Sequence, residues 1–168
     1  MILAYHKIDR RFEFGVTWNT PAQFRRHLAM FQGMGYELLT LTDFLTDKSP
    51  DKLALTFDDG YESVYRNAYP ALEEIGCSFT VFLPVDFVGG WNRWEVNLGG
   101  RKFRHLSWEQ LREMENHCEI GSHTLSHRCL TILPENEIRK ELADSRKILE
   151  DRLGREIKYL SLPFGRYN

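Results

Sequence analysis

Short apolar runs alternate along this chain with longer segments in which apolar residues recur at helical spacing. Five runs are expected to form strands: residues 2–5, 53–57, 78–83, 118–120 and 159–162. Helices are expected between them, beginning near residues 20, 64, 107 and 134. Such alternation is typical of βα units, whose strands form a parallel sheet. The sequence therefore predicts an α/β fold, and no repeat or linker divides residues 1–168 into separate domains.

Local signals indicate where the helices begin and bend. Residues 20–23 and 107–110 each match a capping box, which opens a helix with reciprocal hydrogen bonds. Pro70 lies inside the apolar stripe of residues 64–75, where it predicts a kink or a restart of the helix. In the long helix expected over residues 134–153, the side chains expected to face the core are Ile138, Leu142 and Leu149.

Charge and hydropathy argue against several classes of function. The chain has 22 Lys and Arg residues against 24 Asp and Glu residues, a formal net charge of −2, so a nucleic-acid partner is not expected. No apolar run approaches the roughly 18 residues that a membrane-spanning helix requires. The three cysteines form no CxxC pair and are expected to be reduced thiols.

The first residues carry no sign of a secretory leader. A strand-like segment begins at Ile2, and charges follow at Lys7, Asp9 and Arg10. As written, the sequence is expected to belong to a cytoplasmic protein, or to an extracytoplasmic one if a leader was removed.

Polar side chains follow four of the five expected strands. They are His6, the pair Asp58 and Asp59, the pair His123 and His127, and the turn formed by residues 162–165. The carboxyl ends of parallel strands meet at one edge of a sheet, where α/β proteins build their active sites. These groups are therefore expected to lie close together.

His123 and His127, which follow the fourth expected strand, are four residues apart. One helical turn or a tight loop would therefore direct both imidazoles to one point. Two histidines and one carboxylate form a common catalytic zinc set that leaves a position open for water. Among six histidines in a chain of 168 residues, a pair of this spacing can also arise by chance. A partly exposed loop with two unrelated imidazoles is therefore the alternative interpretation.

Asp58 and Asp59 are adjacent carboxylates directly after a buried strand. Like charges so close raise each other's pKa unless a cation is present. A metal bound by one of them would remove this cost and leave the other as a base. The alternative is a simple turn, because Asp59 and Gly60 form an Asp-Gly turn signal.

The other histidines and tryptophans carry weaker signals. His6 alone is more often a structural residue at a strand end than a catalyst, and His27 shares a helix face with apolar residues, which indicates packing. His105 and His117 have no partner pattern and are assigned no role. Three tryptophans, of which at least two are expected to pack in the core or its rim, could stack on sugar rings: Trp91, Trp94 and Trp108.

In their order along the chain, these pieces resemble the polysaccharide deacetylases, carbohydrate esterase family 4, also called the NodB-homology domain. Residues 56–60 (TFDDG) match the first motif of that family at every position. Residues 122–127 (SHTLSH) match the second motif at its ligand positions, and residues 162–165 (LPFG) resemble the third, with Phe164 where Tyr is usual. Residues 3–6 (LAYH) are similar to the opening strand of a circularly permuted branch, the poly-N-acetylglucosamine deacetylases.

The resemblance implies a role for each of these residues. Asp59, His123 and His127 would hold a divalent metal, most plausibly Zn²⁺. Asp58 would be the general base, and His6 the general acid that the permuted branch carries on its first strand. Three residues of the third motif would contact the substrate and the oxyanion: Pro163, Phe164 and Gly165.

For the whole chain, the resemblance implies a distorted (β/α)7-type barrel, incomplete at its C-terminal side by one or two βα units. Residues 1–168 would be a polysaccharide deacetylase-like catalytic domain. The implied reaction is metal-dependent hydrolysis of N-acetyl groups on an amino-sugar polymer or glycan, with release of acetate. The partner would be an N-acetylated carbohydrate.

Two alternatives of other kinds remain at this point. A catalytically weakened carbohydrate-binding module is one, because Ser161 stands where the family often has an arginine that orients the base, and no fourth motif follows. A barrel amidohydrolase acting on a small non-sugar C–N bond is the other. Both alternatives involve the same site residues as the deacetylase interpretation and differ from it only in the function of the site.

Overall fold

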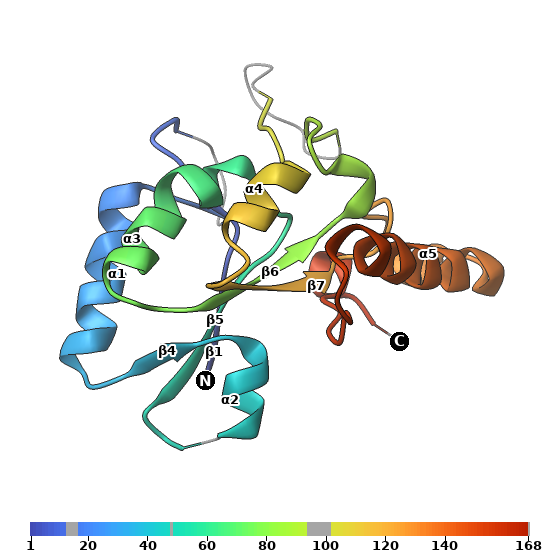
Figure 1. Ribbon diagram of the computed structural model, residues 1–168. Coiled ribbons are helices and arrows are strands. Elements are labelled where there is room, and N and C mark those ends of the chain that lie inside the picture. Colours follow the sequence, from blue (N-terminus) through green and yellow to red (C-terminus); the bar gives the residue numbers. More distant parts are fainter. Residues whose placement is uncertain (13–16, 48, 94–101, 168) are drawn as a thin grey trace.

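The core of the molecule is a parallel sheet of five strands. In a computed structural model, residues 1–168 are described except for residues 13–16, 48, 94–101 and 168. The strands are β1 (Ile2–Tyr5), β4 (Glu37–Leu39), β5 (Lys52–Phe57), β6 (Phe79–Leu83) and β7 (Cys118–Ser122). All their pairings are parallel, which confirms the predicted α/β fold (Figure 1).

Strand β5 is paired along both of its edges. Thr56 lies opposite Ala4 of β1 on one edge and opposite Thr80 of β6 on the other. β4 pairs with the beginning of β5 on the same edge as β6. Residues 53–57 are all buried, as is typical of a parallel strand covered on both faces.

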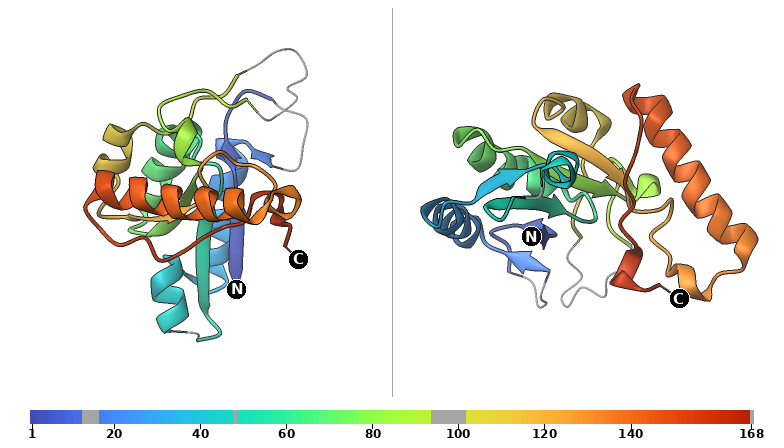
Figure 2. Two further views of the ribbon diagram at one scale, coloured as in Figure 1. Left: turned by 90° about the vertical axis from the view of Figure 1, so that its right-hand side faces the viewer. Right: turned by 90° about the horizontal axis from the view of Figure 1, so that it is seen from below.

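Helices surround the sheet. They are α1 (Pro21–Gly33), α2 (Leu41–Thr46), a π-helical turn (Val64–Ala68) that continues as α3 (Tyr69–Glu74), α4 (Trp108–Glu113) and α5 (Glu135–Leu153). Seen from below, α1, α3, α4 and α5 form an arc around the strands, and α5 lies beside β7 (Figure 2). The remaining elements are the short parallel pair β2 (Lys7–Ile8) and β3 (Trp18–Asn19) and three 3-10 turns (Val85–Phe87, Leu130–Ile132, Pro163–Gly165).

The local helix signals are confirmed. Thr20 and Ser107 each form a capping box with a glutamine three residues later, as the sequence predicts. Pro70 lies in the first turn of α3, where the π-helical turn passes into the α-helix, so the helix restarts there. Proline is tolerated in a first turn because its missing N–H has no partner there.

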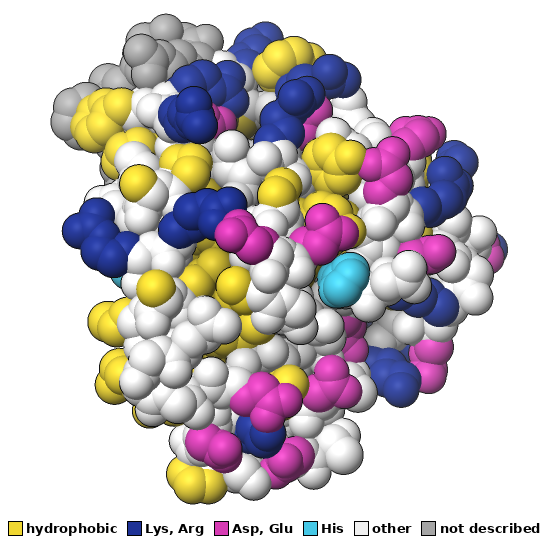
Figure 3. All heavy atoms as spheres, turned by 60° about the vertical axis from the view of Figure 1, so that its left-hand side comes forward, with side chains coloured by type: hydrophobic (Ala, Val, Ile, Leu, Met, Phe, Trp, Pro, Cys, Tyr) yellow, Lys and Arg dark blue, Asp and Glu magenta, His cyan; other side chains and the backbone are white. Residues whose placement is uncertain are grey.

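The core lies between the sheet and the helices around it, with buried apolar residues from α1, α3, α4 and α5. Phe57 of β5 contacts the rings of Phe24 and Phe79 with centroids 5.8 and 5.5 Å apart. On the outer face drawn in Figure 3, Lys and Arg side chains lie among Asp and Glu side chains. None of the described helices combines the length and apolar character that crossing a membrane requires.

Three expectations need correction. The strand expected over residues 159–162 is a single bridge between Leu160 and Ser122, because the segment touches β7 at one point only. The short elements β2, β3, β4 and α2 were not expected, since runs of two to six residues carry too little periodicity. In α5, the fully buried residues are Glu141, Ser145 and Leu149, whereas Ile138 and Leu142 are half-buried.

The expected barrel stays a prediction. The sheet follows the order β1-β5-β6-β7, so β1 and β7 lie at its two ends. Within the part of the chain that the structure describes, no strand pair joins them.

We expect Gly121→Ala to weaken the fold next to the site. A Cβ at this position would collide with the ring of Phe82 and lie 3.1 Å from the carbonyl oxygen of Tyr159. Crowding a packed site costs about 1–3 kcal/mol of unfolding free energy, measurable by denaturant titration. Gly33→Ala is the control, since nothing lies within 4 Å of its Cβ position. Equal stability of the two variants would show that the segment after α5 has room to move.

Candidate metal centre and catalytic site

The polar residues at the strand ends do meet at one edge of the sheet. His6 follows β1, Asp58 and Asp59 follow β5, and His123 follows β7. The Asp58 N–H donates to the Tyr5 carbonyl (2.9 Å), and the His123 N–H donates to the Leu83 carbonyl (2.9 Å). These bonds extend the sheet by one residue and so fix the side chains relative to one another.

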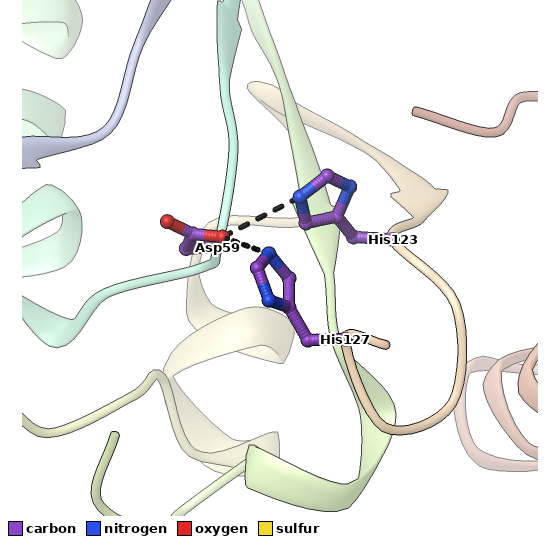
Figure 4. A group of neighbouring side chains, drawn as sticks. All are labelled: Asp59, His123 and His127. Carbon is purple, nitrogen blue, oxygen red and sulfur yellow. Dashed lines mark ion pairs between the residues drawn. The ribbon is translucent and has the colours of Figure 1, made fainter. Parts of the chain in front are cut away.

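Asp59, His123 and His127 form a compact buried group. The Oδ1 atom of Asp59 lies 3.4 Å from Nε2 of His123 and 3.0 Å from Nε2 of His127. The exposed fractions of the three residues are 4%, 2% and 6%. Both imidazoles point toward the carboxylate of Asp59 (Figure 4).

This group fits a divalent metal ion. The three ligand atoms lie within 4.8 Å of one another. Ligands bound tetrahedrally to zinc at roughly 2.0–2.2 Å are about 3.3–3.6 Å apart, close to the two distances in the site. Oδ1 of Asp59 is buried and has no hydrogen bond of good geometry with any described group. A carboxylate oxygen facing two imidazole nitrogens in this way is suited to sharing a cation with them.

Electrostatics keep the carboxylate of Asp59 ionised. Burial alone would raise the pKa of Asp59, but the close approach and the charges of His123 and His127 lower it well below its usual value. Burial would likewise lower the pKa of His123, yet its pairing with Asp59 and the charges of Asp58 and Asp59 raise it. The site is thus arranged to hold negative charge next to a cation.

Two contacts with backbone carbonyls orient this group. Nδ1 of His123 donates to the carbonyl of Ser161 (2.9 Å), which directs Nε2 toward Asp59. Nδ1 of His105 donates to the carbonyl of Asp59 itself (2.7 Å). His105 is buried and comes from the segment that bridges to Tyr61. No local pattern predicts this role, because His105 contacts Asp59 across 46 residues and has no partner at a recognisable spacing.

The backbone of the site is strained. Among the described residues, four non-glycine residues have positive φ angles, and all belong to the three motifs: Asp59 (67°), Thr124 (68°), His127 (58°) and Phe164 (61°). Such conformations persist only where surrounding contacts enforce them, and they cluster at functional sites.

A cavity of about 640 Å³ opens over this group. It is lined by His6, Thr17, Asp58, Asp59, His123, His127, Ser161, Leu162, Phe164, Gly165 and Tyr167. Oδ2 of Asp58 accepts a hydrogen bond from the Ser161 hydroxyl (3.1 Å). The Phe164 ring packs edge-on against His127, 5.0 Å between centroids. Pro163 is buried behind the turn and is not among the lining residues.

The remaining candidates lie away from this cavity. His27 hydrogen-bonds the Tyr5 hydroxyl (2.8 Å), and the ring centroid of His117 lies 6.1 Å from that of Tyr69, with the rings tilted by 49°. Trp108 packs against the core, whereas Trp91 is exposed under the guanidinium of Arg104. Trp94 is outside the described residues.

Comparison with known proteins connects this site to a family. The profile of the polysaccharide deacetylase family matches residues 46–168. The YxkH protein of Bacillus subtilis (strain 168) is 33% identical over 175 residues, covering 99% of this chain and 57% of YxkH. A protein of Staphylococcus aureus (strain MRSA252), named poly-β-1,6-N-acetyl-D-glucosamine N-deacetylase, is 28% identical over 158 residues, which cover 89% of this chain and 54% of that protein.

The fold has close counterparts as well. The structure of IcaB from Ammonifex degensii matches with a TM-score of 0.84 and 25% identity, covering 99% of this chain and 75% of that chain. The chain spans a little over half the length of the two curated relatives above. The family match over residues 46–168 contains all three motifs, and the opening strand lies before it. On this evidence the chain belongs to the polysaccharide deacetylase family.

Proposed function

We propose that residues 1–168 form the catalytic domain of a metal-dependent N-deacetylase that removes acetyl groups from an amino-sugar polymer. The observation that carries this proposal is the convergence of Asp59, His123 and His127 beneath a cavity that Asp58 and His6 also line. An open sheet edge with a buried ligand set and two flanking proton-transfer groups suits hydrolysis of an amide.

Asp59, His123 and His127 are assigned as the metal ligands, and Zn²⁺ suits a set of two imidazoles and one carboxylate. When bound, the metal would supply Lewis acidity at the acetyl carbonyl and would acidify water. All three side chains are buried and line the base of the cavity.

Asp58 is assigned as the general base. It is half-buried at the cavity, next to Asp59 but outside the ligand group. The Ser161 hydroxyl donates to its Oδ2 atom, so the carboxylate is oriented with Oδ1 as the atom that accepts a proton from water. This contact supports catalysis over the binding-module alternative. The family often has an arginine at position 161 that orients the base, and Ser161 also reaches Asp58.

His6 is assigned as the general acid that protonates the leaving nitrogen. Its strand ends level with β5, where Tyr5 lies opposite Phe57, so His6 and Asp58 leave the sheet side by side. Both line the same cavity, which places a proton donor and a proton acceptor around one substrate position.

The third motif is assigned to the developing oxyanion. Pro163 has no N–H, and the Gly165 N–H already donates to the Leu162 carbonyl (3.1 Å). The N–H of Phe164, held in a left-handed conformation, is therefore the group assigned to the oxyanion. The exposed Phe164 ring, 59% accessible, would pack on a sugar face.

For the substrate, the relatives point to one polymer to test first. The Staphylococcus aureus relative is named for poly-β-1,6-N-acetyl-D-glucosamine, and its match extends over 89% of this chain. We also propose that the sheet belongs to a distorted (β/α)7-type barrel, in which further strands would lie between β1 and β7.

We expect His123→Ala and His6→Ala to separate metal binding from catalysis. His123→Ala removes a ligand and should abolish both zinc content and acetate release. His6→Ala removes only the proton donor, so it should keep zinc while acetate release falls about 10²–10⁴-fold. Elemental analysis and an acetate assay on β-1,6-linked N-acetylglucosamine oligomers measure both. Loss of zinc in His6→Ala would contradict the assignment, and acetate release from small amides alone would point to a different substrate class.

A second pair of variants tests the base. Asp58→Asn should keep zinc and lower kcat by about 10²–10⁴-fold, because the amide accepts no proton. Ser161→Ala should lower kcat about 10-fold with zinc content unchanged, since the carboxylate loses its orienting hydrogen bond. Ser161→Thr, which keeps a hydroxyl, is the matched control. If Asp58→Asn lost its zinc, Asp58 would be a ligand and not the base.

A further inference from the structure

The loop that carries His123 and His127 contains two of the strained residues of the site. Thr124 and His127 both have left-handed backbone conformations, and no glycine eases either of them. Residues 123–127 nevertheless bring two imidazoles to the same oxygen of Asp59. A loop of this kind needs contacts outside itself to keep that arrangement.

Helix α5 supplies such contacts through Glu141. This carboxylate is only 5% exposed, although it lies on the face of α5 where an apolar residue would pack at lower cost. Its Oε2 atom accepts hydrogen bonds from the backbone N–H groups of Leu125 (3.0 Å) and Ser126 (2.9 Å). Its Oε1 atom accepts from the hydroxyl of Ser126. All three donors lie between the two histidines.

One turn further along α5, Ser145 holds the beginning of the same loop. The Ser145 hydroxyl donates to the carbonyl of Leu142 (3.0 Å) and lies 2.8 Å from the hydroxyl of Ser122. With its own proton engaged, Ser145 accepts from Ser122, and Ser122 in turn accepts from the N–H of Thr124 (3.1 Å). Glu141 and Ser145 thus hold residues 122–126 from one helix face.

We propose that Glu141 is a positioning residue for the metal site: its hydrogen bonds to Leu125 and Ser126 keep His123 and His127 directed at Asp59. This inference rests on the metal ligands of the proposed function, but not on the reaction or its substrate. Outer contacts that fix ligand geometry typically change metal affinity 10- to 100-fold when they are removed.

The test is the zinc affinity of the purified chain, measured by competition with a chromophoric chelator. Glu141→Leu places an apolar side chain of similar size in the buried stripe and removes every acceptor, so its zinc Kd should rise about 10- to 100-fold. Glu141→Gln keeps an amide oxygen that can accept both backbone N–H groups, so its Kd should stay within about threefold of wild type. This rescue separates the hydrogen bonds from packing.

Leu149→Ala is the matched control, because Leu149 lies in the same buried stripe of α5 two turns further on. It should lower the Tm and leave the zinc Kd of the folded chain unchanged. Ser126→Ala is the second variant if Glu141→Leu does not fold. It removes one of the three hydrogen bonds, and its Kd should rise about 3- to 10-fold.

The outcomes also separate this inference from the proposed function. A wild-type zinc Kd retained in both Glu141→Leu and Ser126→Ala would overturn the positioning role, even if the chain deacetylates its polymer. An equal loss of affinity in Leu149→Ala would overturn it too, since general loosening would then explain the effect. Zinc binding that depends on Glu141 in a chain without deacetylase activity would support the positioning role and refute the proposed reaction. A wild-type chain that bound no zinc would refute both.

Discussion

The two-sided pairing of β5 is the constraint on which the site depends. Thr56 is held between Ala4 and Thr80, so β1, β5 and β6 end in a fixed relation to one another. Asp59 therefore emerges close to the segment that follows β7. β6 pairs in turn with β7, and a slip of one residue between β5 and β6 or between β6 and β7 would turn alternate side chains to the opposite face of the sheet. Asp59 would then no longer face His123.

The proposed site combines three buried side chains assigned to the metal with two more accessible groups assigned to proton transfer. Asp59, His123 and His127 are shielded from water, whereas Asp58 and His6 are half-buried at the cavity. Shielding strengthens the electrostatic attraction between the ligand set and a cation, because the local dielectric is low. Access to the cavity is needed for the groups that exchange protons with substrate and water.

Local strain is distributed over all three motifs of the family, and the surrounding fold compensates for it. Left-handed non-glycine residues cost of order 1–3 kcal/mol each. Around these residues, His105 donates a hydrogen bond to the carbonyl of Asp59, and Glu141 accepts hydrogen bonds from the backbone N–H groups between His123 and His127. These contacts come from segments outside the motifs, so the geometry of the site depends on much of the domain.

The sequence by itself determined the order of the main strands and helices, the capping boxes and which polar residues meet at the carboxyl ends of the strands, because periodicity and motifs are local patterns. Tertiary structure alone decided the rest. The contact of His105 with Asp59 joins residues 46 apart, and Glu141 takes a place on α5 that periodicity would give to an apolar residue. Residues 159–162 look like a strand, yet they meet β7 at a single bridge. In each case the deciding factor is which distant backbone groups come within reach, and that depends on packing rather than on local pattern.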